Sequence, residues 1–399
     1  MLESVPVHGI CAPRFARVRE IFANSFESGQ ELGAAVAFVL DGETVVDLWG
    51  GYCDEARTRP WTRDTLVNVF SATKGMTALC AHRLIEQGLL ELDAPVAKYW
   101  PEFAAAGKED LRVRWLLSHK AGLCAIRKPL PIGAFYDWQL MCDALAEQAP
   151  WWEPGTDHGY HAFTFGFLIG ELVRRVTGES IGAFFRRSIA QPLGADFHIG
   201  VSEEDDARVA TVYGAAAGNR PIPTTPPPPG PFAEFSRAVR DPSTMQHATV
   251  FNPPQATMDV NTRKWRAAEI PSVNGHGSAA GLARIYGALA RGGEIGGVRI
   301  LAPATIERAI TEEAFGPDRF TIGVPSRYGL GFQLSHASMD GYARLSPNPR
   351  AFGHTGAGGS LGMADPDAKL GVGFTLNQLH PGIMSPTAAA MIDAFYEAR

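Results

Sequence analysis

The chain contains little cysteine, and its cysteines are dispersed. Five occur in 399 residues, at Cys11, Cys53, Cys80, Cys124 and Cys142. Their number is odd, and none of them shows the short paired spacing of a metal-binding motif. This distribution argues against a disulfide framework and against a zinc site, and it favours a reducing compartment.

Long apolar runs and basic stretches are also missing. No segment approaches the apolar length of a membrane span, and the net charge of −6 is mild. We therefore expect neither a membrane nor a nucleic acid among the partners of this chain. The opening residues 1–6 contain no basic group and no long apolar stretch, so we expect no signal peptide and a cytoplasmic location.

The order of the patterns that are present predicts two domains. The predicted strands are 34–40, 43–48, a run ending at Phe70, 328–334 and 372–376. The predicted helices are 13–27, 71–87, 165–178, 180–189, 278–292 and one starting at Ser385. We therefore predict a sheet domain from 1–75 and 275–399. A mainly helical domain, 76–274, lies between them, with a long proline-rich loop at 220–231.

Ser71 and Lys74 stand at a predicted strand-to-helix junction, in the spacing Ser-x-x-Lys. At i and i+3 the two side chains share one helical face, so the amine lies within reach of the hydroxyl. A desolvated lysine can lose its proton and act as the base that a serine nucleophile needs. The simpler alternative is that Ser71 is an ordinary helix N-cap.

Three later segments carry further polar candidates. His119 follows an apolar segment and precedes Ala121-Gly122, a setting more typical of a structural hydrogen bonder than of a catalytic imidazole. Tyr160 follows a Pro-Gly turn and alone would be interpreted as an aromatic wedge at a helix start. His354-Thr355-Gly356 follows a predicted strand near the C-terminus.

The order Ser71-x-x-Lys74, Tyr160 and His354-Thr355-Gly356 resembles the serine β-lactamase and penicillin-binding-protein superfamily. Within it, the chain is most similar to the class C-type branch and its family VIII carboxylesterases. The resemblance covers nearly the whole chain, including residues 116–123 and 160–178. It implies an α+β, two-domain fold: an antiparallel sheet formed from both termini and flanked by helices, with an inserted, mainly helical domain.

The resemblance also implies roles for individual residues. Ser71 would be the acylated nucleophile, and Lys74 and Tyr160 would form the general base pair. Since a tyrosine has a pKa of about 10, Tyr160 would need a nearby cation, and Lys74 is the candidate. The backbone N–H groups of Ser71 and Ala357 would form the oxyanion hole. His354, Thr355 and Gly356 would bind substrate, and no metal or cofactor is implied.

Two departures from the β-lactamase pattern favour neutral esters. The usual Tyr-x-Asn is replaced by Tyr160-His161-Ala162, which lacks the amide that grips an acylamide side chain. The usual Lys-Thr-Gly is replaced by His354-Thr355-Gly356, and histidine is largely neutral at pH 7. We therefore predict a serine carboxylesterase acting on short-chain, small-molecule esters. A β-lactamase or an acyltransferase using the same machinery remains an alternative, and the oligomeric state is left open.

Two rival interpretations remain. Gly358-Gly359-Ser360-Leu361-Gly362 matches the Gly-x-Ser-x-Gly nucleophile elbow of α/β-hydrolases, which requires a strand before the serine and a helix after it. An Asp365-Pro366 turn follows instead, which favours a glycine-rich strand. The other rival is a non-hydrolytic binding module that keeps the fold for ligand sensing.

Overall fold

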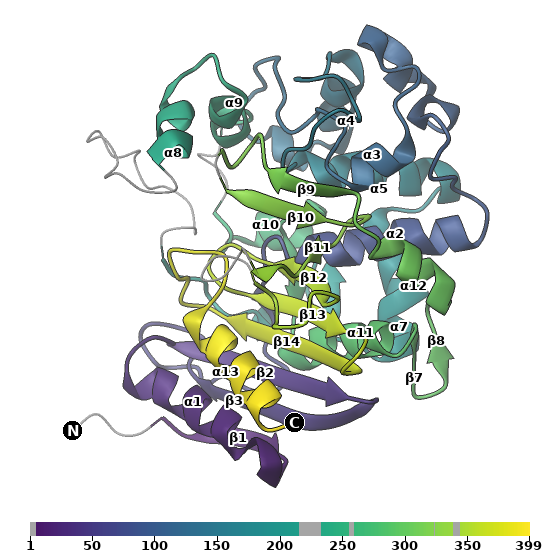
Figure 1. The fold of residues 1–399 in the computed structure, drawn as a ribbon. Helices are drawn as coiled ribbons and strands as arrows, with labels where there is room; N and C mark the ends of the chain where they lie inside the picture. The colour runs from purple at the N-terminus through teal and green to yellow at the C-terminus, as the bar shows by residue number, and fades with distance from the viewer. Residues whose placement is uncertain (1–4, 215–232, 255–258, 323, 338–343) are drawn as a thin grey trace.

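A computed structural model describes residues 5–214, 233–254, 259–322, 324–337 and 344–399 (Figure 1). The predicted proline-rich loop at 220–231 lies outside the described residues. Among the helices that are described, none combines the length and the apolar character needed to cross a membrane.

The largest sheet contains strands from both ends of the chain. Nine antiparallel strands lie in the order β1-β3-β2-β14-β13-β12-β11-β10-β9. Their bounds are β1 Val7–Cys11, β2 Gly33–Leu40, β3 Glu43–Gly51, β9 Ala314–Pro317, β10 Pro325–Tyr328, β11 Gln333–Leu334, β12 Phe352–Thr355, β13 Leu361–Asp365 and β14 Leu370–Leu376. Because β2 pairs with β14, the N-terminal and C-terminal strands form one continuous sheet, which confirms the predicted fold class.

The strands predicted at 34–40 and 43–48 form a hairpin. Asp41 and Gly42 have φ of 49° and 90°, the left-handed pair that a two-residue hairpin turn of this twist requires. The turn joins β2 to β3 in antiparallel register. Almost all of β2 is buried, because it lies in the middle of the sheet with helices on both faces.

Helices cover both faces of this sheet (Figure 1). On one face, α1 (Ala16–Glu27) and α13 (Pro386–Glu397) pack side by side and share a core with the apolar side chains of the central strands. On the other face, α11 (Ala279–Ala290) lies against β14, β2 and β13. Its N-cap Ser278 accepts the backbone N–H of Gly281, as the sequence predicts for a helix beginning there.

The part of the chain between the sheet segments is mainly helical, as predicted. Its helices of five or more residues are α2 Thr73–Glu86, α3 Val113–Leu117, α4 Trp138–Glu147, α5 Thr164–Thr177, α6 Ile181–Phe185, α8 Ala233–Arg240, α9 Met245–Phe251 and α10 Arg263–Ala267. In the chain order, α12 (Pro303–Ala309) follows α11. The buried helix α2 contacts α5, α6 and strand β12, so it connects the helical part to the sheet.

Several boundaries differ from the prediction. The strand that ends near Phe70 is only β4 (Val67–Asn68). It pairs with β6 (Gly275–Gly277), which also pairs with β5 (Phe197–Ile199), in a separate small sheet. Strand β5 comes from the region predicted to be helical, so this sheet crosses the proposed boundaries at 75 and 275, which stay a prediction. The edge strand β1 was not predicted, since its residues show no alternation of apolar side chains.

Two predicted elements are interrupted. The strand expected at 328–334 is divided into β10 and β11, because Gly331 takes a φ of +87° where the chain passes Ala78 of α2. The helix expected to stop before Pro192 continues to Leu193 through a wider, π-type turn at 186–190. A wider turn accommodates a proline, which has no N–H to donate.

The close contact of α11 with the sheet predicts a stability effect. A Cβ atom on Gly371 of β14 would lie 2.1 Å from the backbone nitrogen of Gly287. We expect Gly371→Ala to lower the free energy of unfolding by about 1–3 kcal/mol, because helix and strand would have to separate. The measurement is chemical denaturation. Gly382→Ala is the control, since its Cβ would have no neighbour closer than 4.0 Å; equal losses in both variants would contradict the packing argument.

Candidate active site

Ser71 follows a residue in an unusual backbone conformation. Phe70 has a φ of 47°, which turns the chain sharply between β4 and α2. The helix begins at Thr73 rather than at Ser71, and its N-cap residue Ala72 provides no side-chain cap. The helix-cap alternative for Ser71 is therefore wrong, and its half-buried hydroxyl is not used to close the helix.

Lys74 lies wholly buried beside that hydroxyl. Its Nζ is 3.3 Å from Ser71 Oγ, 2.8 Å from the carbonyl oxygen of Ala162 and 3.1 Å from that of Ser272. Burial lowers the pKa of the Lys74 ammonium well below its usual value. A neutral amine has two N–H donors and one lone pair. The two carbonyls can only accept, so the lone pair is left for the Ser71 O–H.

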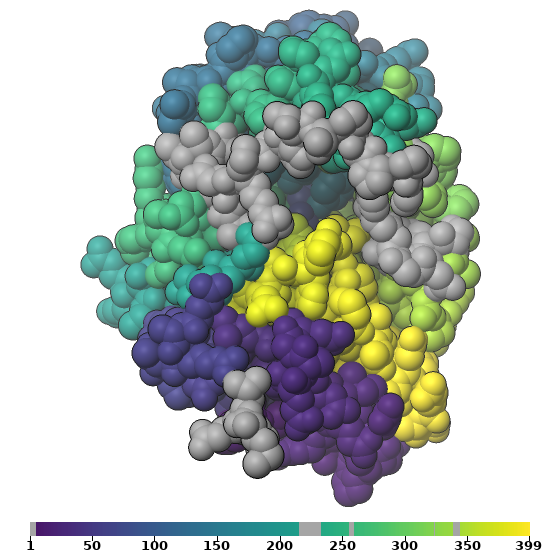
Figure 2. Space-filling view, turned by 90° about the vertical axis from the view of Figure 1, so that its left-hand side faces the viewer, coloured from purple at the N-terminus to yellow at the C-terminus, as the bar shows by residue number. Residues whose placement is uncertain are grey.

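Tyr160 completes the group of three predicted catalytic residues. The Lys74 Nζ lies 4.6 Å from the centre of the Tyr160 ring. Tyr160 and Ser71 are both half-buried, whereas Lys74 is inaccessible. The structure thus brings together the Lys74 amine and the Tyr160 ring, which are almost ninety positions apart in the sequence. In Figure 2 the surface is hollowed between the C-terminal part of the chain, in yellow, and the green-to-blue helical part.

The loop that carries Tyr160 is held by its backbone. The N–H groups of Gly159 and His161 donate to the carbonyl oxygen and to Nδ1 of His119, at 3.0 and 3.1 Å. The N–H of Tyr160 itself donates to Asp318 Oδ1 at 3.2 Å. His119 is buried and is the structural hydrogen bonder that the sequence suggested.

Two contributors were missed by the sequence analysis: Ser272 and Asp318. Ser272 accepts from Lys74 through its carbonyl, and its hydroxyl donates to Phe163 O and accepts from Gly166 N–H. Each contact joins residues far apart in the sequence, and no local motif marks them.

The motif His354-Thr355-Gly356 lies beside the segment that leads to Ser71. The N–H of Gly356 donates to Ser360 O, and the Ser360 hydroxyl donates to Val69 O, both at 2.7 Å. A Cβ on Gly356 would lie 2.2 Å from Val69 O, so only glycine permits this approach. The half-buried Ala357 follows directly. The oxyanion-hole role of the Ser71 and Ala357 N–H groups stays a prediction that this arrangement favours.

The surroundings of Ser360 indicate a structural role rather than a catalytic one. Its side chain is 2% exposed and hydrogen-bonded to Val69, and strand β13 rather than a helix follows it. It therefore does not lie on a nucleophile elbow, which requires a helix at that point.

The histidines around Lys74 are neutral. The His354 ring is 1% exposed, and its Nδ1–H donates to Thr355 O at 2.6 Å. Burial lowers the pKa of His354 to about 3. Burial also lowers the pKa of His161 to about 3 and that of His119 well below its usual value. None of the three provides a cation at neutral pH.

These features agree with what comparison to known proteins finds. A sequence model described as Beta-lactamase matches residues 18–394. The chain belongs to the β-lactamase family. The esterase/beta-lactamase LipL of Mycobacterium tuberculosis is 37% identical over 383 residues, which cover 95% of this chain and 84% of LipL.

Solved structures of the family have the same fold. A structure described as a family VIII carboxylesterase is 42% identical, with a TM-score of 0.86, over 99% of this chain and 100% of that chain. A penicillin-binding protein homologue from Caulobacter crescentus is 37% identical, with the same TM-score and coverage. The superfamily resemblance found from the sequence is confirmed.

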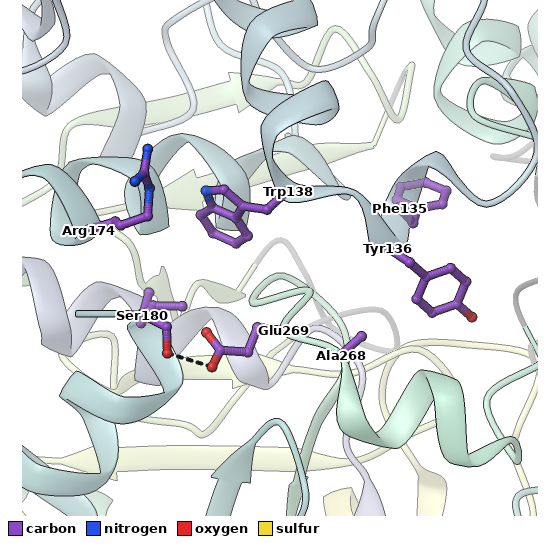
Figure 3. A pocket seen from close by; sticks show the side chains of 8 residues that line it. Phe135, Tyr136, Trp138, Arg174, Ser180, Ala268 and Glu269 are labelled. Carbon is purple, nitrogen blue, oxygen red and sulfur yellow. Dashed lines mark hydrogen bonds between the residues drawn. The ribbon is translucent and has the colours of Figure 1, made fainter. Parts of the chain in front are cut away.

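A separate cavity of about 240 Å³ lies between α4, α5 and the start of α6 (Figure 3). Its polar groups are tied to one another: the Ser180 hydroxyl donates to the Glu269 carboxylate at 2.7 Å, and Glu269 also accepts the N–H of Gly182. Ser180 caps α6. No lysine or histidine lines this cavity, so it offers Ser180 no base comparable to Lys74.

The first prediction about activity separates the two candidate serines. We expect Ser71→Ala to lower kcat/KM for ester hydrolysis by about 10³-fold or more, because it removes the nucleophile. Ser360→Ala removes one hydrogen bond, worth about 1 kcal/mol, and should cost about tenfold or less. Hydrolysis that survives the first change and is lost with the second would show that the nucleophile is Ser360.

The second prediction concerns the base. Since the pKa of Lys74 is depressed, the neutral amine is present above that pKa, and kcat/KM should rise as the pH increases through it and then stay level. Lys74→Arg keeps a cation that does not deprotonate and should lower kcat by about 10²-fold across the profile. An unchanged profile in the arginine variant would exclude Lys74 as the base. With a pKa of about 3, His354 should add no step between pH 5 and 8.

Proposed function

We propose that this protein is a serine carboxylesterase that hydrolyses short-chain esters through an acyl-enzyme at Ser71. The observation that carries the proposal is the buried amine of Lys74 at 3.3 Å from the Ser71 hydroxyl, with its other two contacts made to acceptors. This is the arrangement that activates a serine, and it occurs beside a partly accessible tyrosine.

The reaction follows from these positions. Ser71 Oγ attacks the ester carbonyl carbon while its proton passes to the Lys74–Tyr160 pair. The carbonyl oxygen becomes an oxyanion that accepts from the N–H groups of Ser71 and Ala357. As the C–O bond to the leaving alcohol breaks, the alkoxide takes up the stored proton. Water then attacks the acyl carbon and gives a proton to the same pair. The bond between that carbon and Ser71 Oγ breaks, the pair returns the proton to Ser71, and the acid is released.

The charge of the site favours neutral substrates. A β-lactam carries a carboxylate, for which a lysine in the third motif would be a fixed partner. Here the corresponding side chain is His354, which is neutral and buried. His161, at the middle position of the tyrosine motif, is bonded to Gly159 and Leu123 within the protein. Esterases among the relatives, such as LipL and the family VIII structure, support the same substrate class.

Hydrolysis of β-lactams is the second candidate, because the name of LipL joins both activities. Transfer of the acyl group to an alcohol would use the same acyl-enzyme. We propose a small-molecule ester as the partner of the site and a cytoplasmic location, without a metal or cofactor.

The third prediction ranks these substrates. We expect nitrophenyl acetate and butyrate to be turned over with higher kcat/KM than the decanoate ester or a chromogenic cephalosporin. Among the described residues, the buried and neutral His354 stands where a lysine would bind the lactam carboxylate. A cephalosporin preferred over every ester would contradict the assignment. Mass spectrometry with an activated ester provides the control: an adduct on Ser71 that never turns over would indicate a sensor rather than a hydrolase.

A further inference from the structure

A buried carboxylate holds the backbone of the proposed base. The N–H groups on either side of Tyr160 donate to His119, on one side of the loop. The N–H of Tyr160 donates in another direction, to Asp318 Oδ1 at 3.2 Å. Three successive peptide groups are thus fixed from two parts of the chain, and Asp318 holds the central one.

Asp318 has a full set of partners. It is 2% exposed and follows strand β9 directly. Oδ1 also accepts the N–H groups of Phe320 and Thr321 at 2.8 and 3.0 Å, and Oδ2 accepts the hydroxyl of Ser326 at 3.0 Å. A buried carboxylate is costly unless it is satisfied in this way. Such a group is therefore a precise acceptor with little freedom to move.

The segment around Asp318 is itself held against the tyrosine loop. The N–H of Arg319 donates to His158 O at 3.1 Å, and Ser326 Oγ lies 3.1 Å from His158 Nε2. From α9, the Gln246 side chain donates to the carbonyl oxygens of Arg319 and Phe320. Residues 318–320, which follow β9, are therefore held in place from several sides, and they contact the candidate site through the peptide N–H of Tyr160.

We propose that Asp318 is a positioning residue for the reaction, which holds the backbone of Tyr160 so that its ring stays against the Lys74 amine. The inference rests on the proposed function, because it gives Tyr160 a role in proton transfer. Asp318 does not act on substrate. Its carboxylate sets the position of the Tyr160 backbone, and a base displaced by about 1 Å loses as much as about 10²-fold in rate.

A second buried carboxylate provides a matched control. Asp365, at the end of β13, is fully buried and accepts two backbone N–H groups, from Asp367 and Ala368, each at 2.9 Å. It also accepts from the Asn348 side chain at 2.7 Å and from the Tyr396 hydroxyl. The partners of Asp365 all belong to the sheet domain, and none of them is a proposed site residue. Removing this carboxylate therefore measures what the loss of a similarly hydrogen-bonded, buried acid costs the protein when none of the partners lies in the site.

The experiment compares Asp318→Ala, Asp318→Asn and Asp365→Ala by their steady-state kinetics with nitrophenyl acetate and by thermal unfolding. We expect Asp318→Ala to lower kcat by about 10- to 100-fold with KM changed less than about threefold. Asp318→Asn keeps an amide oxygen for the same N–H groups and should restore kcat to within about fivefold of the parent. Asp365→Ala should lower the melting temperature with kcat per folded molecule unchanged.

A Tyr160→Phe background decides whether Asp318 acts through Tyr160. In that background Asp318→Ala should lower kcat by less than about threefold, because the hydroxyl that it positions is already absent. Full additivity of the two losses, an unchanged kcat in Asp318→Ala, or no recovery in Asp318→Asn would each overturn the inference. If the alanine variant does not fold, Asp318→Glu, which moves the acceptor by one methylene, replaces it with the same expected loss. Ser71→Ala tests the proposed function separately, since its loss of hydrolysis does not depend on the results at Asp318.

Discussion

The contact between the Lys74 amine and the Ser71 hydroxyl is the interaction on which the rest of the site depends. A lysine without exposed surface is costly as an ammonium, and no carboxylate is among its hydrogen-bonding partners in the described part of the chain. Its partners are two carbonyl oxygens and one hydroxyl. That set suits an amine with two hydrogens and a lone pair. Burial therefore favours the neutral form, and an amine in that form keeps its lone pair for the Ser71 hydroxyl.

Three surrounding segments maintain the contact between the Lys74 amine and the Ser71 hydroxyl. Helix α2 fixes the spacing of Ser71 and Lys74, the tyrosine loop supplies the Ala162 carbonyl, and the segment before β6 supplies the Ser272 carbonyl. The Ser272 hydroxyl joins the last two, because it bonds to the backbone of residues 163 and 166. Displacing any of these segments would change the partners of the amine, and with them the balance between its charged and neutral forms.

The parts of the site that could be predicted were those set by local geometry. Ser71 and Lys74 lie one turn apart on a helix whose pattern is evident in the sequence, and the superfamily resemblance added Tyr160 and the His354 strand. Asp318 and Ser272 could not be found in this way, since each acts on residues more than a hundred positions away. The fold shows the same limit. The meeting of both termini in one sheet was predicted, but the pairing of β4 with β6 in a separate sheet was not, because two residues carry too little pattern to indicate a partner.

The neutrality of the neighbouring histidines has a consequence for substrate choice. A charged side chain in place of His354 would act on two groups at once: it would attract an anionic substrate, and it would alter the pKa of Lys74 through the same low-dielectric space. A buried imidazole with a pKa of about 3 does neither at neutral pH. The proton affinity of Lys74 is then set by burial and by its three hydrogen-bonding partners. A neutral His354 thus leaves Lys74 free for its proposed role as base and offers no counter-ion to a carboxylate, which is the combination that suits an uncharged ester.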